Sequence, residues 1–318
     1  MARKIHTILL QSCPRQDSLC ALFLLRREGE KKYPGISTAK IAFWTTGTIS
    51  PDGRTWKDYL NEGIFPIGVC GSPWDEHTSL EFGDRKAEGK STTSLVAEEL
   101  GISDHPHYRE LVKAVTAADL NKVSGLDMSS IIKNAYRDPE ADWEKIYRWL
   151  ETGLKWFINN QIRLQEAFRE LKSKNAAIRR NNCGGEVVAI MSDNPSICLA
   201  ASLLRFAACV QIRSNGQVLI AANGRTDISL EKTVVAIRFE ELVAQGREKE
   251  AQKSTDSLSV TGQMPLVPNW CYQMPGDMLL NGSETAPGLE PTRIPALKIL
   301  QTVCETTIRV NKKNPVAT

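Results

Sequence analysis

The chain has 318 residues, of which 42% are hydrophobic, and this is enough for two domains with cores of their own. Its 40 basic and 37 acidic residues nearly cancel, so the composition gives no strong electrostatic footprint for a long nucleic-acid duplex, although a local basic groove stays open. None of the eight cysteines forms a Cys-x-x-Cys pair, which argues against a zinc cage.

Several cysteines lie in apolar runs, as Cys209 does between Ala208 and Val210. A thiol in such a run packs as a small hydrophobic group, so we expect free thiols in a reducing compartment. The apolar run after Lys4 is too short to span a membrane and lacks a convincing cleavage site. We therefore expect a cytoplasmic protein without a membrane partner.

The first part of the chain predicts an α/β domain. Short apolar runs that are typical of buried strands span residues 5–11, 40–46 and 64–69. Apolar residues at helical spacing predict a helix over 17–27, directly after the polar loop 12–16. Asp17 fits the common role of a helix cap or first-turn acid, or that of a metal ligand at the carboxyl end of a strand.

The third strand is followed by a Gly-Ser-Pro turn and then by Asp75, Glu76 and His77 side by side. Carboxylate oxygen and imidazole nitrogen are ligands that Mn²⁺ accepts, and a loop at the end of a strand can bring them together. An ordinary polar surface turn is the alternative interpretation. Beyond a polar loop at 83–90, the pattern predicts helices over 92–100 and 108–120, the second of which contains Asp119.

A helical pattern then continues almost without interruption from residue 143 to residue 178, and the glycines of 181–185 predict a boundary. We expect a first domain over 1–142, a helical connector over 143–182 and a second, smaller α/β domain over 183–318. In the second domain, the sequence predicts a strand at 186–191, helices at 194–206, 229–244 and 295–304, a mobile charged loop at 247–255, and a hairpin that turns at Ser214-Asn215-Gly216.

The arrangement of these elements and motifs resembles the DHH-type phosphoesterase superfamily, and more narrowly its MYG1-like branch. The likeness lies in the loop 12–17 before a helix, the turn 68–71 before Trp74-Asp75-Glu76-His77, the helix 92–100 and Asp119. It covers most of the chain as a pattern of elements with sparse motifs, and it implies a parallel-sheet domain joined by long helices to a smaller domain.

The resemblance implies metal ligation by Asp17, Asp75, His77 and Asp119, with Asp75 and His77 as catalytic residues. In such proteins two ions, typically Mn²⁺, activate water against a phosphodiester. This chain departs from the family pattern at Ser12 and Arg15, at Gly68, where the preceding strand usually ends in Asp, and at Glu76, where His is usual. Its ligands could hold one ion, whereas two would be under-coordinated, so one or two Mn²⁺ or Mg²⁺ ions remain open.

The resemblance also places substrate binding in the second domain. The turn Asn281-Gly282-Ser283 would cradle a phosphate with its backbone N–H groups, Arg238 would neutralise charge and Trp270 would stack on a base. A solvated helix face for Arg238 and a core position for Trp270 are equally good interpretations.

We expect a metal-dependent phosphodiesterase or exonuclease, a hydrolase that acts on a nucleotide or a short single-stranded oligonucleotide. The alternative is a catalytically inactive DHH-like protein that binds a nucleotide or nucleic acid as a sensor or assembly component, with Arg15 in the place of an ion. A pure interaction protein with the helix 143–178 as its contact surface has no specific support. The oligomeric state stays open, with a homodimer among the alternatives. Both leading hypotheses predict that Asp17, Asp75, His77 and Asp119 converge around a divalent ion or Arg15.

Overall fold

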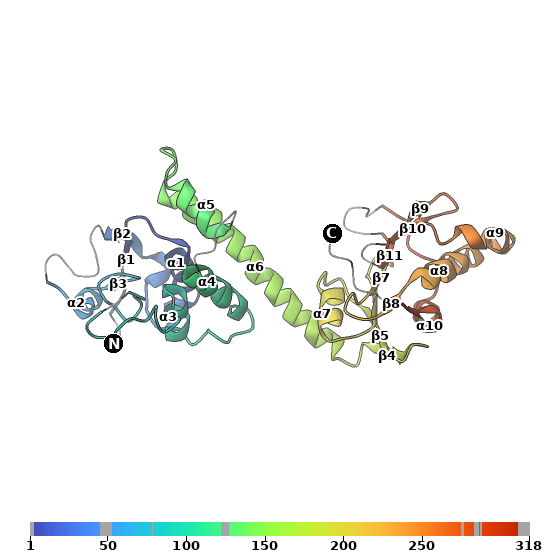
Figure 1. The fold of residues 1–318 in the computed structure, drawn as a ribbon, viewed down its shortest axis with the longest axis horizontal. Coiled ribbons are helices and arrows are strands. Elements are labelled where there is room, and N and C mark those ends of the chain that lie inside the picture. The colour runs from blue at the N-terminus through green and yellow to red at the C-terminus, as the bar shows by residue number, and fades with distance from the viewer. Residues whose placement is uncertain are drawn as a thin grey trace. The chain divides into compact units, whose positions relative to one another are not determined.

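The computed structural model of the protein describes residues 3–44, 53–77, 79–121, 127–274, 277–282, 286 and 288–310. As the sequence predicts, the chain is a mixed α/β protein (Figure 1). It divides into two compact units, Met1–Ile162 (unit 1) and Arg163–Thr318 (unit 2).

Unit 1 contains a three-stranded parallel sheet in the order β2-β1-β3, with β1 (Thr7–Gln11) between β2 (Lys40–Trp44) and β3 (Ile64–Pro66). Ile8 and Leu10 of the central strand are fully buried. Because all three strands run in the same direction, the loops that leave their carboxyl ends lie at one edge of the sheet, where open α/β folds place their sites.

The helices of unit 1 are α1 (Gln16–Glu28), α2 (Trp56–Asn61), α3 (Thr92–Glu99), α4 (Arg109–Asn121), α5 (Met128–Ala135) and the first part of α6 (Trp143–Leu171), with the 3-10 turns η1 (Gly29–Lys31) and η2 (Ile36–Thr38). Helix α1 contacts α3, α4 and α5. Its residues from Asp17 to Leu25 are all buried, so it lies in the middle of the unit, as a helix that is apolar on all sides must. Asp17 is therefore carried into the interior at the start of this helix.

Unit 2 is built on a seven-stranded sheet in the order β4-β5-β6-β7-β11-β10-β9, in which only β5 and β6 pair in parallel. Its strands are β4 (Ala177–Arg180), β5 (Glu186–Met191), β6 (Ala208–Ile212), β7 (Val218–Ala222), β9 (Gly262–Met264), β10 (Val267–Gln273) and β11 (Met278–Asn281), and a separate pair is formed by β8 (Ile228–Ser229) and β12 (Ile308–Arg309). The predicted hairpin is confirmed, because β6 and β7 pair antiparallel across the Ser214-Asn215-Gly216 turn.

The helices of unit 2 are the last part of α6, α7 (Ile197–Leu203), α8 (Glu231–Ala244), α9 (Glu248–Lys253) and α10 (Ala296–Thr306), with the turn η3 (Thr255–Ser257). Two buried clusters hold the unit together. One packs α8 and α10 against the sheet, and the other packs α7 and Leu164, Ala167 and Leu171 of α6 against β5 and β6.

Two element predictions are wrong. The helix does not continue to residue 178, because Ala177–Arg180 is strand β4, which pairs antiparallel with β5. The charged stretch 247–255 is largely the helix α9. Arg247, directly before this helix, pairs with Glu250 at 2.8 Å, and Ala251 of the helix is buried. In addition, β3 ends at Pro66 rather than near residue 69, and the sequence analysis did not predict the helices α2 and α5.

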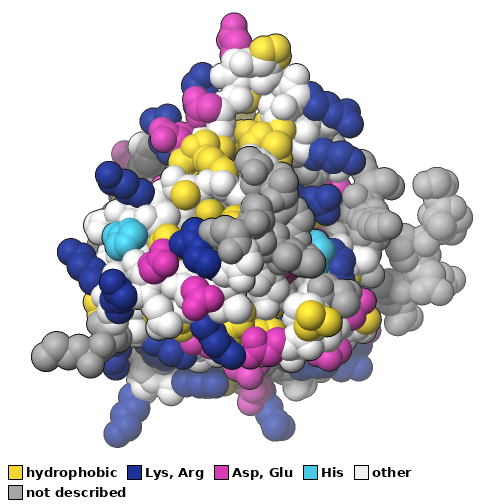
Figure 2. Space-filling model, turned by 90° about the vertical axis from the view of Figure 1, so that its left-hand side faces the viewer, with side chains coloured by type: hydrophobic (Ala, Val, Ile, Leu, Met, Phe, Trp, Pro, Cys, Tyr) yellow, Lys and Arg dark blue, Asp and Glu magenta, His cyan; other side chains and the backbone are white. Residues whose placement is uncertain are grey.

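The eight cysteines are all free thiols in the structure. Among the described residues, no helix has both the length and the apolar character that crossing a membrane requires. On the face shown in Figure 2, basic and acidic side chains are interspersed around a group of hydrophobic ones, in line with the near balance of charges in the sequence.

Candidate metal centre

The turn after β3 directs three polar residues back to the sheet edge. Gly68, Cys70 and Gly71 have φ angles of 60°, 63° and 56°, a left-handed conformation that glycine adopts easily and cysteine rarely does. Trp74 is buried and stacks on Phe65 of β3, with ring centroids 4.0 Å apart, so the turn is fixed to the sheet. The residues that follow therefore have a defined position.

Asp75 closes this turn and holds His77. Its Oδ2 accepts a hydrogen bond from the Gly71 N–H at 3.0 Å, and its Oδ1 accepts from the backbone N–H of His77 at 3.1 Å and from the ring Nδ1 at 2.8 Å. The bond to Asp75 raises the pKa of His77 to about 8. Both oxygens of Asp75 are thus satisfied by the protein, and Nε2 is the ring nitrogen of His77 left for a ligand.

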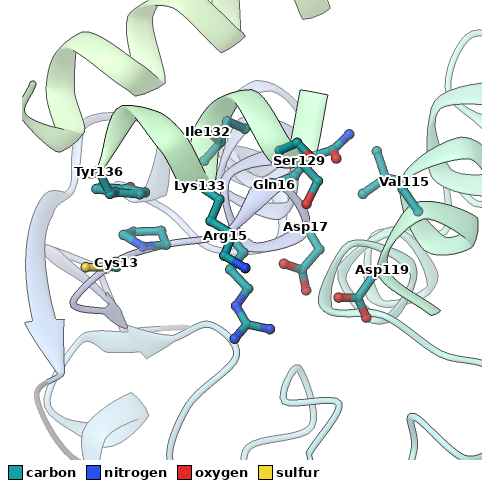
Figure 3. Close-up of a pocket in the computed structure, with 13 residues that line it drawn as sticks. Cys13, Arg15, Gln16, Asp17, Val115, Asp119, Ser129, Ile132, Lys133 and Tyr136 are labelled. Carbon is teal, nitrogen blue, oxygen red and sulfur yellow. The ribbon is translucent and has the colours of Figure 1, made fainter. Parts of the chain in front are cut away.

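Glu76 also belongs to a second group of acids, together with Asp17 and Asp119. Asp17, Glu76 and Asp119 each offer an oxygen, and these three atoms lie within 4.8 Å of one another. Asp17 and Glu76 are only 3% and 4% exposed. Figure 3 shows the carboxylates of Asp17 and Asp119 side by side.

Asp17 is not satisfied by the protein. Its Oδ2 is buried and has no hydrogen-bond partner among the described residues. Burial raises the pKa of Asp17 to about 7, and the charges of Glu76 and Asp119 act in the same direction. The cluster therefore requires either a proton or a cation next to Asp17.

The start of α3 anchors two members of this cluster, Glu76 and Asp17. The Thr92 hydroxyl donates to Oε2 of Glu76, and the Thr93 hydroxyl donates to the backbone carbonyl of Asp17 at 2.6 Å. A Cβ on Gly68 would lie 3.1 Å from the Thr92 oxygen, so a side chain at this position would crowd the contact. This explains in part why glycine stands at position 68, in the turn after β3.

The cation that the structure places beside the acids is Lys86. Its Nζ lies 2.7 Å from Oδ2 of Asp119. Arg15, which was expected as the alternative to a metal ion, makes no ion pair in the described part of the chain, although it lines the same cavity as Asp17. The expectation for Arg15 is therefore corrected in favour of Lys86.

The residues fit a divalent cation. Lys86 pairs with Asp119, the ring Nδ1 of His77 lies 3.6 Å from Oε1 of Glu76, and Asp17 has no ion-pair partner among the described residues. The Oδ2 atom of Asp17 has no partner among the described residues and can therefore bind a cation. Carboxylate oxygens suit hard ions such as Mg²⁺ and Mn²⁺. The Asp75–Glu76–His77 group also has ligand atoms within 4.8 Å, but its aspartate is already satisfied, so the geometry favours one ion at the Asp17 group.

A cavity of about 630 Å³ opens beside these acids. Asp17 and Asp119 form part of its wall (Figure 3). The other lining residues are Cys13, Pro14, Arg15, Gln16, Val115, Ala118, Ser129, Ser130, Ile132, Lys133 and Tyr136. All of them belong to unit 1, so the acids and the cavity are one site within one unit.

The substrate residues predicted in the second half of the chain are interior. Arg238 and Trp270 are both fully buried. The guanidinium of Arg238 donates to the backbone carbonyls of Leu258, Val260, Gly262 and Trp270. The indole of Trp270 donates to Glu241 at 3.0 Å. Neither side chain offers a surface to phosphate or base, which corrects the expectation that they bind substrate.

The predicted phosphate turn is also engaged by the protein. Asn281 is fully buried, donates to the carbonyls of Asn269 and Glu290, and accepts from the Thr292 N–H. Gly282 has a φ of 80°, and its Cα faces the side chain of Gln217. Ser283 lies outside the described residues. The side chain of Asn281 therefore has a structural role.

Sequence reasoning missed Lys86 and Thr92. It named Glu76 in the turn of candidate ligands, but the ligand set implied by the resemblance left it out, because the family pattern has His at this position. Lys86 in a polar loop and Thr92 at a helix start are ordinary residues there. Only the packing of α3 and of the loop before it against the turn brings them to the site.

No family model matches the chain, and no curated protein matches it. Among solved structures, it is similar to an uncharacterized protein from Helicobacter pylori G27, with 11% identity and a TM-score of 0.28 over 74% of this chain and 90% of that chain. It is also similar to the DHH domain of a member of a family of ribosomal proteins, with 11% identity and a TM-score of 0.25 over 80% of this chain and 86% of that chain. One weak structural neighbour is thus a DHH domain, and at these TM-scores neither similarity carries an argument about function.

Proposed function

We propose that the protein is a divalent-metal-dependent phosphodiesterase of the DHH type, which hydrolyses a nucleotide or a short single-stranded oligonucleotide with Mn²⁺ or Mg²⁺. The observation that carries the proposal is the enclosed group of Asp17, Glu76 and Asp119, in which one buried oxygen has no partner among the described residues, beside a cavity large enough for an organic ligand.

In this proposal Asp17, Glu76 and Asp119 hold the ion. When bound, the ion supplies a polarised phosphoryl oxygen and a more acidic water. Asp75 orients His77 through Nδ1, which is how carboxylates commonly fix a histidine that binds a metal or a phosphate with its other nitrogen. Lys86 pairs with Asp119 and holds its carboxylate in place.

A second candidate function is binding without catalysis, and one observation favours it. Lys86 already pairs with Asp119 at 2.7 Å, and a lysine can take the position of a cation in a degenerate metal site. The chain would then bind a nucleotide or nucleic acid as a sensor or assembly component, without turnover.

Other parts of the assignment rest on the sequence alone. These are the narrower MYG1-like branch, the division into a metal domain (1–142), a connector (143–182) and a substrate domain (183–318), a homodimer, and a cytoplasmic setting. Because Arg238 and Trp270 are buried, they no longer support substrate binding in the second domain. The cavity in unit 1 is the better-supported binding site.

The test combines metal analysis with hydrolysis assays on purified protein. With Mn²⁺, we expect hydrolysis of bis-p-nitrophenyl phosphate or of short single-stranded oligonucleotides, and loss of this activity in Asp17→Asn, which removes a charged ligand but keeps its shape. Nucleotide binding without hydrolysis in the wild type would support the second candidate. Absence of both Mn²⁺ binding and nucleotide binding would contradict the two candidates together.

A further inference from the structure

The cavity carries two cations that the proposed ion site does not use. Arg15 immediately precedes α1, and Lys133 lies in the last turn of α5. Both side chains line the cavity and are exposed. Neither forms an ion pair or a side-chain hydrogen bond within the part of the chain that the structure describes.

The two cations line the same cavity as Asp17 and Asp119. Asp17 lies two residues after Arg15, in the first turn of α1, and is buried toward Glu76 and Asp119. Lys133 comes from α5, which packs against α1. In Figure 3 the side chains of Arg15 and Lys133 enter the same space, and the carboxylate of Asp17 lies between them and Asp119.

The two cations are available to an anionic ligand. Both side chains are exposed to the cavity, and neither has a carboxylate partner among the described residues. Guanidinium and ammonium groups are the side chains that bind phosphate oxygens most strongly.

The size and the remaining walls of the cavity suit a nucleotide. Its volume of about 630 Å³ is far more than one ion and its waters occupy. It falls within the range of roughly 300 to 1,000 Å³ that is usual for small-molecule sites. Pro14, Val115, Ile132 and Tyr136 give it an apolar side that a base or sugar can contact.

We propose that Arg15 and Lys133 form a metal-independent site for the phosphate group of a nucleotide that fills this cavity. The proposal rests on the proposed function in one respect only. A second phosphate, the one to be hydrolysed, would lie at Asp17, Glu76 and Asp119. The phosphate site itself requires no metal ion and no catalysis.

The test is calorimetric titration of AMP and of adenosine into the full-length protein in EDTA, so that no divalent ion contributes. We expect AMP to bind at least about ten-fold more tightly than adenosine, because a charge-assisted contact is worth roughly one factor of ten or more. Arg15→Met and Lys133→Met should each weaken AMP about ten-fold and leave adenosine unchanged. Inorganic phosphate should compete with AMP in the wild type.

Lys113→Met is the matched control, because Lys113 is an exposed lysine on α4 that does not line the cavity. It should bind AMP as the wild type does. The proposal is overturned if the Arg15→Met/Lys133→Met double variant binds AMP like the wild type, if adenosine binds as tightly as AMP, or if the wild type binds no AMP in EDTA. Failure of the proposed function is a different result, namely AMP binding in EDTA without any Mn²⁺-dependent hydrolysis.

Discussion

At the scale of single residues, Asp17 shows how a functional position differs from a structural one. Its neighbours in α1 are buried because they are apolar, whereas Asp17 is buried beside two other acids and leaves one oxygen without a partner among the described residues. Burying an ionised carboxylate in this way costs free energy unless a cation compensates it. The site therefore favours a positively charged ligand.

From this we predict that Asp17→Asn makes the metal-free protein more stable at pH 8, by about 1 to 3 kcal/mol. The amide removes a charge and can donate to Glu76 or Asp119. Denaturant unfolding in EDTA measures the effect. With Mn²⁺ the order should reverse, because only the wild type gains stability from the ion. An asparagine variant that is less stable in EDTA would show that the acid is structurally required.

Gly282 illustrates a residue that the fold itself requires. A Cβ here would lie 2.3 Å from the side chain of Gln217, at a φ of 80°. We predict that Gly282→Ala lowers the free energy of unfolding by about 2 kcal/mol or more. Gly153 in α6 is the control, since a Cβ there meets no atom within 4 Å. Gly153→Ala should stabilise by up to about 1 kcal/mol, and equal effects of the two variants in urea melts would contradict this interpretation.

At the scale of elements, α3 links the turn after β3 to α1 through two threonines in its first turn. We predict that Thr92→Val weakens Mn²⁺ binding about ten-fold, because Glu76 loses the hydroxyl that orients it. Thr152→Val is the control, since the Thr152 hydroxyl only donates to the Arg148 carbonyl within α6. Titration with Mn²⁺ measures both variants. Unchanged affinity in Thr92→Val would mean that Glu76 does not depend on α3.

The elements also show what sequence patterns can predict. The strand at 186–191 and the start of the helix at 92 match the structure, because apolar periodicity and a capping serine are local signals. The strand β4 was missed, because its conformation depends on pairing with β5 and its four residues are exposed. A local sequence pattern predicts a helix or strand correctly only where contacts with residues far away in the sequence do not change the conformation.

The same division applies to the site. Asp17, Asp75 and His77 could be proposed from sequence, because each follows the end of a strand and such ends share one edge of a parallel sheet. The contributions of Lys86 and Thr92 depend on tertiary packing and leave no trace in the sequence. The burial of Arg238 and Trp270 could not be predicted either, because a single sequence does not distinguish an arginine that binds carbonyls inside a unit from one that binds phosphate.

At the scale of the whole molecule, the metal centre and its cavity are built from unit 1 alone. We predict that Trp270→Phe, which removes the indole bond to Glu241 in unit 2, lowers the free energy of unfolding by about 1 to 3 kcal/mol. It should leave the Mn²⁺ affinity of the folded protein within about two-fold of the wild type, because Trp270 and the ion site belong to different units. Calorimetry with Mn²⁺ below the unfolding temperature checks this. A large loss of affinity would show that unit 2 contributes to the ion site.

The central claim is that one divalent ion binds among Asp17, Glu76 and Asp119. The most direct measurement is the binding of Mn²⁺ to metal-free protein, followed by the electron paramagnetic resonance signal of the free ion. We predict one tight Mn²⁺ per chain in the wild type, its loss in Glu76→Gln, and its retention in Glu98→Gln, where the acid lies on the surface beside Lys90. Absence of tight Mn²⁺ binding in the wild type, or equally tight binding in Glu76→Gln, would contradict the claim.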